Sequence, residues 1–244
     1  MSTLYVVATP IGNLSDISQR AIETLKLVDY ILCEDTRVSQ KMLTRFDIKK
    51  PLIAYHQHSE LSKVNEILEM LRQGKNLALI SDAGTPGVSD PGGQLVKAIV
   101  QEFGNNVNPN TKQSYGVVVK IEPIPGPCAL TAIASVCGFP MERFVFLGFP
   151  PAKKKRKQFF EEVVNSKYPV VFYESPYRIL KTLSEISKYR NIEISSVVGR
   201  ELTKKFETIY RGTIEEVAKQ IENGKVGGRT KGEFVICLST RRDG

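Results

Sequence analysis

The chain has 244 residues, of which 41% are hydrophobic and 25% are charged. This length suits one large domain or two smaller ones, and the composition excludes a wholly disordered chain, a collagen and a coiled coil. The formal charge of +8 favours a polyanionic partner such as RNA, although a basic protein with no such partner fits it equally well.

No apolar run approaches the roughly 20 residues that a membrane-spanning helix needs. The first ten residues also lack the basic start of a secretory signal peptide. We therefore expect a cytoplasmic protein with no membrane partner.

Cysteine and histidine are too sparse to suggest a metal centre. The four cysteines are scattered, with no Cys-x-x-Cys pair, which argues against a disulfide or zinc framework. His56 and His58 would lie on one face of a strand and could contact one metal ion. Because no third ligand lies nearby, the pair favours a polar strand end.

The first half of the chain alternates short apolar segments with amphipathic helical ones. Helices are expected from Ser15 as N-cap to Val28 and from Ser59 to Gly74. A third helix is expected after residue 93, reaching about Phe103. Strands are expected at residues 4–8, 30–33, 52–55, 76–80 and 117–121. This alternation predicts a mostly parallel sheet with helices on both faces, whose ligands lie beyond the carboxyl ends of the strands.

Two segments interrupt this pattern. Residues 104–116 are polar and rich in Asn, which predicts an exposed loop or hairpin insertion. Residues 123–127, Pro-Ile-Pro-Gly-Pro, stiffen the chain and mark a domain junction. We therefore expect an N-terminal domain over residues 1–122 and a C-terminal domain over residues 123–244.

The second half is less regular but again mixes helices and strands. Helices are expected at residues 128–137, 154–164, 177–188 and 214–222, and strands at 144–147, 170–173, 194–198, 206–210 and 234–238. The irregular spacing favours an α/β domain with a mixed sheet.

A loop rich in Gly and Pro, residues 82–93, follows the fourth expected strand. Its glycines allow the backbone to approach a ligand, and Asp82 is placed to accept hydrogen bonds from a hydroxyl or amine. A purely structural turn is the alternative. The sequence lacks the GxGxxG, P-loop and GxSxG patterns, so ordinary dinucleotide, NTPase and hydrolase sites are not supported.

The turn at residues 125–130 leads into a helix N-terminus. Free backbone N–H groups at such a position can hold a carboxylate or another acceptor. Cys128 lies there, either as a nucleophile favoured by the helix dipole or as a small thiol packed among its neighbours.

Three charged segments each follow an apolar strand, at residues 34–37, 174–178 and 200–205. Together they suggest a charged cleft formed by both halves, in which basic side chains grip phosphates and Tyr177 stacks on a base. The basic run at residues 153–157 is either a solvated face or an RNA backbone contact.

The segments ATPIGNLSDIS, CEDTR, ISDAGTPGVSDPG, PIPGPCALTA, YESPYR, GRELTKKFE and KGEFVI occur in this order between residue 4 and about residue 238. In this combination the sequence resembles the ribosomal RNA small subunit methyltransferase I family, which belongs to the tetrapyrrole-methylase-like (class III) S-adenosylmethionine-dependent methyltransferases.

The resemblance implies two α/β domains with S-adenosylmethionine in the cleft between them. It also implies a homodimer that methylates the 2′-oxygen of a cytidine in the decoding centre of 16S rRNA, in the small ribosomal subunit. By motif, the cofactor would contact Pro10, Ile11, Asp82, Gly84, Thr85, Cys128, Ala129 and Tyr173. The family usually has Ser where Cys128 stands, and residues 104–116 are longer than its usual link.

A ribose hydroxyl is a weak nucleophile, so a general base would assist the transfer. The candidates by position are Glu34, Asp35, Glu174 and Glu201, and the candidates for orienting or gripping the substrate are Arg37, Arg178, Arg200 and Lys204. Three other functions remain open: a small-molecule (tetrapyrrole-type) methylase, a thiol enzyme using Cys128 with His56, and a non-catalytic RNA-binding module.

Overall fold

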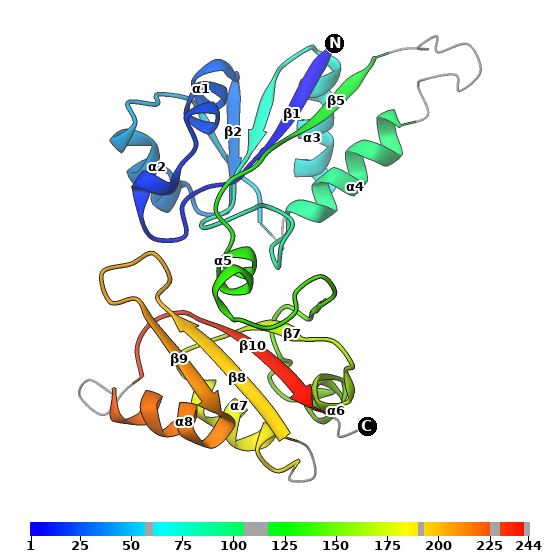
Figure 1. Ribbon diagram of the computed structural model, residues 1–244. Helices are drawn as coiled ribbons and strands as arrows, with labels where there is room; N and C mark the ends of the chain where they lie inside the picture. The colour runs from blue at the N-terminus through cyan, green and yellow to red at the C-terminus, as the bar shows by residue number, and fades with distance from the viewer. Residues whose placement is uncertain (57–60, 105–116, 190–192, 225–229, 242–244) are drawn as a thin grey trace. The chain divides into compact units, whose positions relative to one another are not determined.

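The computed structural model describes residues 1–56, 61–104, 117–189, 193–224 and 230–241 (Figure 1). The chain divides into two compact units, Met1–Cys128 and Ala129–Gly244, called here the first and second units. Each contains a five-stranded sheet. Residues 105–116 of the insertion predicted at 104–116 lie outside the described residues, as does His58 of the His56–His58 pair.

The sheet of the first unit is entirely parallel, which confirms the mostly parallel sheet that the sequence predicts. Its strand order is β3-β2-β4-β1-β5, so β1 lies between β4 and β5. The strands are β1 (Ser2–Val7), β2 (Tyr30–Cys33), β3 (Leu52–Ala54), β4 (Leu77–Leu79) and β5 (Val119–Ile124). Since all strands run the same way, the loops after β1, β2, β4 and β5 leave from one edge.

Helices cover both faces of this sheet. They are a 3-10 turn at Leu14–Asp16 followed by α1 (Gln19–Leu27), α2 (Thr36–Arg45), α3 (Leu61–Arg72) and α4 (Gly92–Phe103). Leu4 and Leu77 pack with α3 and α4, whereas Val7 and Ala78 pack with α1 and α2. Alternate strand residues therefore enter different cores, as the two-residue period of a strand requires.

Two helical features differ from the sequence-based expectation. Ser18, not Ser15, caps α1 by accepting a hydrogen bond from the Ala21 N–H. Helix α2 was not predicted, because its sequence buries only Ser39 and Leu43 and so lacks a broad apolar stripe. Its N-cap is Asp35, whose carboxylate accepts the Arg37 N–H at 2.8 Å.

The second unit has a mixed sheet of order β6-β7-β10-β8-β9, which confirms the prediction for this half. Among its described strands, β6 and β7 pair in parallel and the other neighbours are antiparallel. The strands are β6 (Val145–Phe146), β7 (Val170–Glu174), β8 (Glu193–Arg200), β9 (Thr208–Thr213) and β10 (Phe234–Arg241). The prediction that Phe206 begins a strand is wrong, since it lies in the turn between β8 and β9.

Three helices pack on one face of this sheet: α6 (Arg156–Asn165), α7 (Ile179–Ile186) and α8 (Ile214–Asn223). Helix α5 (Ala129–Val136) contacts β10. Across the part of the chain that the structure describes, no helix is long and apolar enough to cross a bilayer.

Candidate functional site

The connections after β1, β2, β4 and β5 leave the carboxyl edge of the first unit's sheet, where parallel α/β sheets bind their ligands. Main-chain hydrogen bonds join two of them. Thr9, after β1, donates its N–H to the Gly84 carbonyl at 2.9 Å, and the Gly84 N–H returns a bond to Thr9 at 3.1 Å. The Thr85 hydroxyl then donates to the Pro127 carbonyl at 3.1 Å, which ties in the loop after β5. The predicted loop at residues 82–93, called here the glycine loop, is therefore held between the connections after β1 and β5.

Glycine is favoured at two points of this arrangement. Gly84 has φ +84°, and a Cβ there would lie 3.3 Å from Cγ2 of Ile11. A Cβ on Gly126 would lie 3.1 Å from that of Ala8. Both glycines thus allow adjacent loops to approach more closely than side chains permit. Sequence reasoning singled out Gly84 and Ile11 but missed Thr9 and Gly126, whose roles depend on contacts distant along the chain.

Acidic side chains follow β2 and β4 at the same edge. The exposed Asp82 accepts the Asp35 N–H at 3.2 Å, and Asp90 stabilises the glycine loop by accepting the Gly87 and Gly92 N–H groups at 2.7 Å each. Burial raises the pKa of the half-buried Glu34, and the carboxylates of Asp82 and Asp90 raise it further. Glu34 is thus a carboxylate with increased proton affinity beside the glycine loop.

Asp35 and Arg37 pair with each other on the surface. The Arg37 guanidinium donates to both Asp35 oxygens, at 3.1 and 2.7 Å, and holds the pKa of Asp35 at about 2. A carboxylate with so low a pKa is a weak base.

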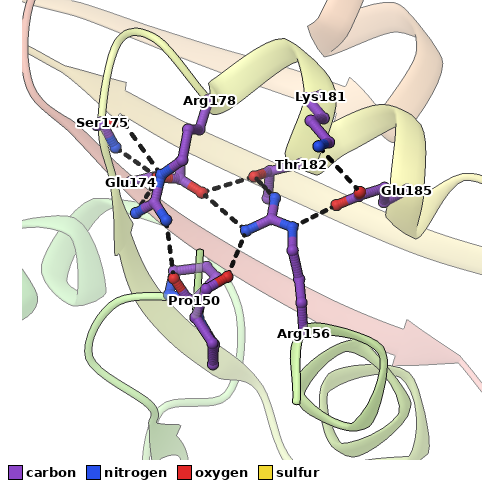
Figure 2. Close-up of polar contacts among 9 residues, drawn as sticks. Pro150, Arg156, Glu174, Ser175, Arg178, Lys181, Thr182 and Glu185 are labelled. Carbon is purple, nitrogen blue, oxygen red and sulfur yellow. Dashed lines mark hydrogen bonds and ion pairs between the residues drawn. The ribbon is translucent and has the colours of Figure 1, made fainter. Parts of the chain in front are cut away.

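The second unit contains a buried charged network around Glu174, the last residue of β7 (Figure 2). One of its oxygens accepts the Ser175 N–H at 2.7 Å and the Arg178 guanidinium at 2.8 Å. The other accepts the Thr182 hydroxyl at 2.6 Å. Glu174 and Arg178, both predicted site residues, therefore pair with each other and hold the turn that carries Tyr177.

Arg156 completes the network and corrects the reading of residues 153–157 as uniformly a solvated face or an RNA contact. Its side chain is 7% exposed and bonds Glu185 at 2.6 Å, Thr182 at 2.7 Å and the Pro151 carbonyl at 3.0 Å (Figure 2). It also lies 3.9 Å from Glu174. The four Lys residues of the run stay exposed, so only they remain available to a polyanion.

Tyr173 precedes Glu174 and is half-buried. Its ring packs edge-on against Phe146 and Phe149, with centroids 5.1 and 5.4 Å away, and its N–H donates to the Gly148 carbonyl. This predicted cofactor residue is thus part of an aromatic group at the carboxyl end of β6 and β7.

A second ionic cluster holds the turn after β8. The Lys204 ammonium lies 3.0 Å from Glu201 and 2.8 Å from Glu233, and Glu201 also accepts the Glu233 N–H. Although burial raises the pKa of Glu201, the Glu233 N–H and Lys204 outweigh it and lower that pKa overall. Arg200 donates to the Lys231 carbonyl at 2.7 Å. Three predicted site residues therefore stabilise this turn, and Glu233 is the partner that the sequence did not indicate.

Cys128 and Ala129 are half-buried and lie where the first unit ends and the second begins. Within the described ranges, no three His, Cys, Asp or Glu side chains are grouped closely enough to hold a metal ion.

Residues 3–218 match the sequence profile of the tetrapyrrole (corrin/porphyrin) methylases. The chain belongs to this family. Within the family it is 43% identical to the ribosomal RNA small subunit methyltransferase I of Haemophilus influenzae over 96% of this chain and 77% of that protein. The protein of the same name from Thermotoga maritima is 38% identical over 98% of this chain and 99% of its own length.

Solved structures of similar fold are more distant in sequence. A diphthine synthase superposes with a TM-score of 0.68 at 14% identity, covering 98% of this chain and 90% of that one. The uroporphyrin-III C-methyl transferase of Thermus thermophilus, complexed with S-adenosyl homocysteine, superposes with a TM-score of 0.60 at 18% identity, covering 96% of each. These likenesses show that the chain has this fold over nearly its whole length.

Proposed function

We propose that the protein transfers a methyl group from S-adenosylmethionine to the 2′-oxygen of a cytidine ribose in the decoding centre of 16S rRNA. The observation that carries this proposal is the near-full-length similarity, at about 40% identity, to proteins named ribosomal RNA small subunit methyltransferase I. An rRNA substrate is consistent with the charge of +8, and it supports the prediction of a cytoplasmic enzyme. A homodimer remains a prediction.

The carboxyl edge of the first unit suits the cofactor. Asp82 offers an exposed carboxylate to an amine or hydroxyl, and Gly84 leaves the backbone open to a ligand. Pro10, Ile11 and Thr85 lie on the connections that carry or contact Gly84, whereas Cys128 and Ala129 follow the Pro127 carbonyl that Thr85 contacts. When bound, S-adenosylmethionine supplies an electrophilic methyl group on a sulfonium. We also propose that Tyr173, from the second unit, contacts the cofactor.

Glu34 is the candidate that we propose as general base. Glu174 is buried with both oxygens occupied, and the pKa values of Asp35 and Glu201 are lowered by cationic or N–H partners. The pKa of Glu34 is raised, so its carboxylate takes a proton from a hydroxyl more readily than those of Asp35 and Glu201.

Replacing Glu34 with Gln is expected to lower kcat by about 100-fold or more while leaving S-adenosylhomocysteine affinity within a few-fold. In the unmodified enzyme, kcat should rise with pH through the raised pKa of Glu34, because the carboxylate form accepts the proton. The E34Q variant should lose this rise. Glu23→Gln, an exposed change on α1, is the control. Glu34 would be excluded as the base if the E34Q variant kept full kcat and kcat still rose with pH as in the unmodified enzyme.

The proposed function is tested by incubating the protein with methyl-labelled S-adenosylmethionine and small ribosomal subunits that lack the modification. Label should enter 16S rRNA at one cytidine, and the adjacent phosphodiester should resist alkaline hydrolysis, since a 2′-O-methyl group blocks that cleavage. Label on a base or on protein would refute the 2′-O assignment. Loss of transfer in a folded Cys128→Ser variant would instead favour the thiol enzyme.

A further inference from the structure

Three exposed aromatic side chains lie at one edge of the second unit's sheet. Phe149 follows β6, Tyr177 follows β7 and Phe206 lies in the turn after β8, with exposed fractions of 51%, 90% and 68%. Each belongs to a different connection, so their common position depends on the register of the strands.

The register brings these three connections together. β6 runs parallel to β7, so both end at the same edge. β10 is antiparallel to β7 and to β8, and its first residue, Phe234, pairs with both Glu174 and Arg200. The turns after β7 and β8 therefore leave the sheet at the same level, about 10 Å apart, which is two strand spacings.

Hydrogen bonds hold the backbone segments that carry these aromatic residues. Arg178 bonds Pro150 at 3.0 Å, which ties the turn of Tyr177 to the segment of Phe149 (Figure 2). The turn of Phe206 is held by the Lys204 cluster, by the Thr203 N–H bond to Glu207, and by the buried Leu202. Glu201 and Thr203 both adopt positive φ, at 51° and 68°. Strained backbone of this kind persists where the surrounding structure over-determines it, often at functional sites.

Cations accompany the aromatic residues. The Lys205 ammonium lies 5.6 Å from the Phe206 ring centroid, and Lys231 is exposed on the neighbouring segment before β10. Lys153–Lys155 are exposed between Pro151 and Arg156, both held by the buried network. The carboxylates of this edge are engaged: Glu174 in the buried network, Glu201 and Glu233 with Lys204, and Glu207 with Thr203.

We infer that this edge, defined by Phe149, Tyr177 and Phe206, binds unpaired nucleotides of the RNA substrate by stacking bases on the three rings. Unstacked bases pack on exposed aromatic faces while nearby Lys residues contact phosphates. Protein interfaces, in contrast, are depleted of Lys at their cores, so the mixture of rings and Lys favours RNA. The inference rests on the proposed RNA substrate and adds the part of the chain that would hold it.

The test compares Phe149→Ala, Tyr177→Ala and Phe206→Ala with Phe144→Ala. Phe144 is a partly exposed ring just before β6, at the opposite edge of the same sheet. Affinity is measured by fluorescence anisotropy for a short single-stranded RNA and for the same RNA annealed to its complement. Each of the three variants should bind the single strand about 5- to 100-fold more weakly, and Phe144→Ala should bind unchanged. Tyr177→Phe and Phe206→Tyr should retain affinity.

Salt dependence separates stacking from charge. Lys205→Gln should reduce the slope of log affinity against log salt by about 0.7, whereas the alanine variants should leave the slope unchanged. Melting temperatures verify that each variant is folded. Equal losses for Phe144→Ala, or no loss for the three edge variants, would overturn the inference. Absence of methyl transfer by the unmodified enzyme would overturn the proposed function instead, and the binding comparison would still decide the role of this edge.

Discussion

Replacing Arg156 with Met is expected to lower the free energy of unfolding by about 3–5 kcal/mol, the usual cost of breaking a buried ion pair by removing one partner. The Arg156 side chain is 7% exposed and donates to Glu185, Thr182 and the Pro151 carbonyl. Methionine fills similar space but removes the Arg156 donor from all three acceptors, and Glu185 then has only the Lys181 ammonium at 4.0 Å near it. The change should be measured by urea unfolding, with thermal melting as a second probe.

Lys154→Met is the matched control, because Lys154 lies two residues away in the same basic run and is exposed. It should change stability by no more than about 0.5 kcal/mol. A double-mutant cycle of Arg156→Met with Glu174→Gln should give a coupling energy of about 1–3 kcal/mol, since the two residues share Thr182. If Arg156→Met unfolded with the same free energy as Lys154→Met, the Arg156 side chain would have to be solvated in the folded protein.

Replacing Gly84 with Val is expected to weaken S-adenosylhomocysteine binding by about 100-fold or more, and methyl transfer with it. A non-glycine residue at φ +84° costs about 1–2 kcal/mol, and the added Cβ would lie 3.3 Å from Ile11. The larger Val side chain and the unfavourable φ are expected to displace the loop from Thr9 and to weaken the hydrogen bonds that join the connections after β1 and β4. Titration calorimetry measures the affinity directly.

Gly93→Ala is the control for the same loop. Gly93 lies in the first turn of α4, and a Cβ there would meet no atom within 4 Å. The Gly93→Ala protein should bind S-adenosylhomocysteine as tightly as the unmodified protein. Its α4 should be slightly more stable, because alanine has a higher helix propensity than glycine. Normal ligand affinity in a folded Gly84→Val protein would show that the close approach of the two loops is not needed for binding.

The similarity to distant methylases shows that this fold alone does not determine the substrate. Diphthine synthase and uroporphyrin-III C-methyl transferase structures superpose over nearly the whole chain at 14% and 18% identity. Folds of this kind host different activities, so the substrate must be decided by side chains on the connections. The Lys and aromatic residues at the edge of the second unit's sheet are therefore a better guide to the substrate than the fold is.

Local patterns in the sequence were sufficient to predict most helices and strands and the type of each sheet. The run at residues 30–33 predicts a strand with the bounds that β2 has, and alternation of strands and helices predicts the parallel sheet. Helix α2 escaped prediction because it buries only two side chains. The strand predicted from Phe206 begins two residues later, at Thr208, because Phe206 continues the alternation of Thr208 and Tyr210 but lies in the turn before β9.

The tertiary structure alone decided which polar groups meet. Arg156 stands in a run of lysines, and nothing in that run indicates that its side chain is buried while the others are exposed. Thr9 meets Gly84 and Glu201 meets Glu233 only because strand order and register bring distant segments together. Propensity and periodicity depend on neighbours along the chain, so they determine which elements form. Hydrogen bonds between connections depend on the packed sheet, so only the fold determines the surroundings of each candidate residue.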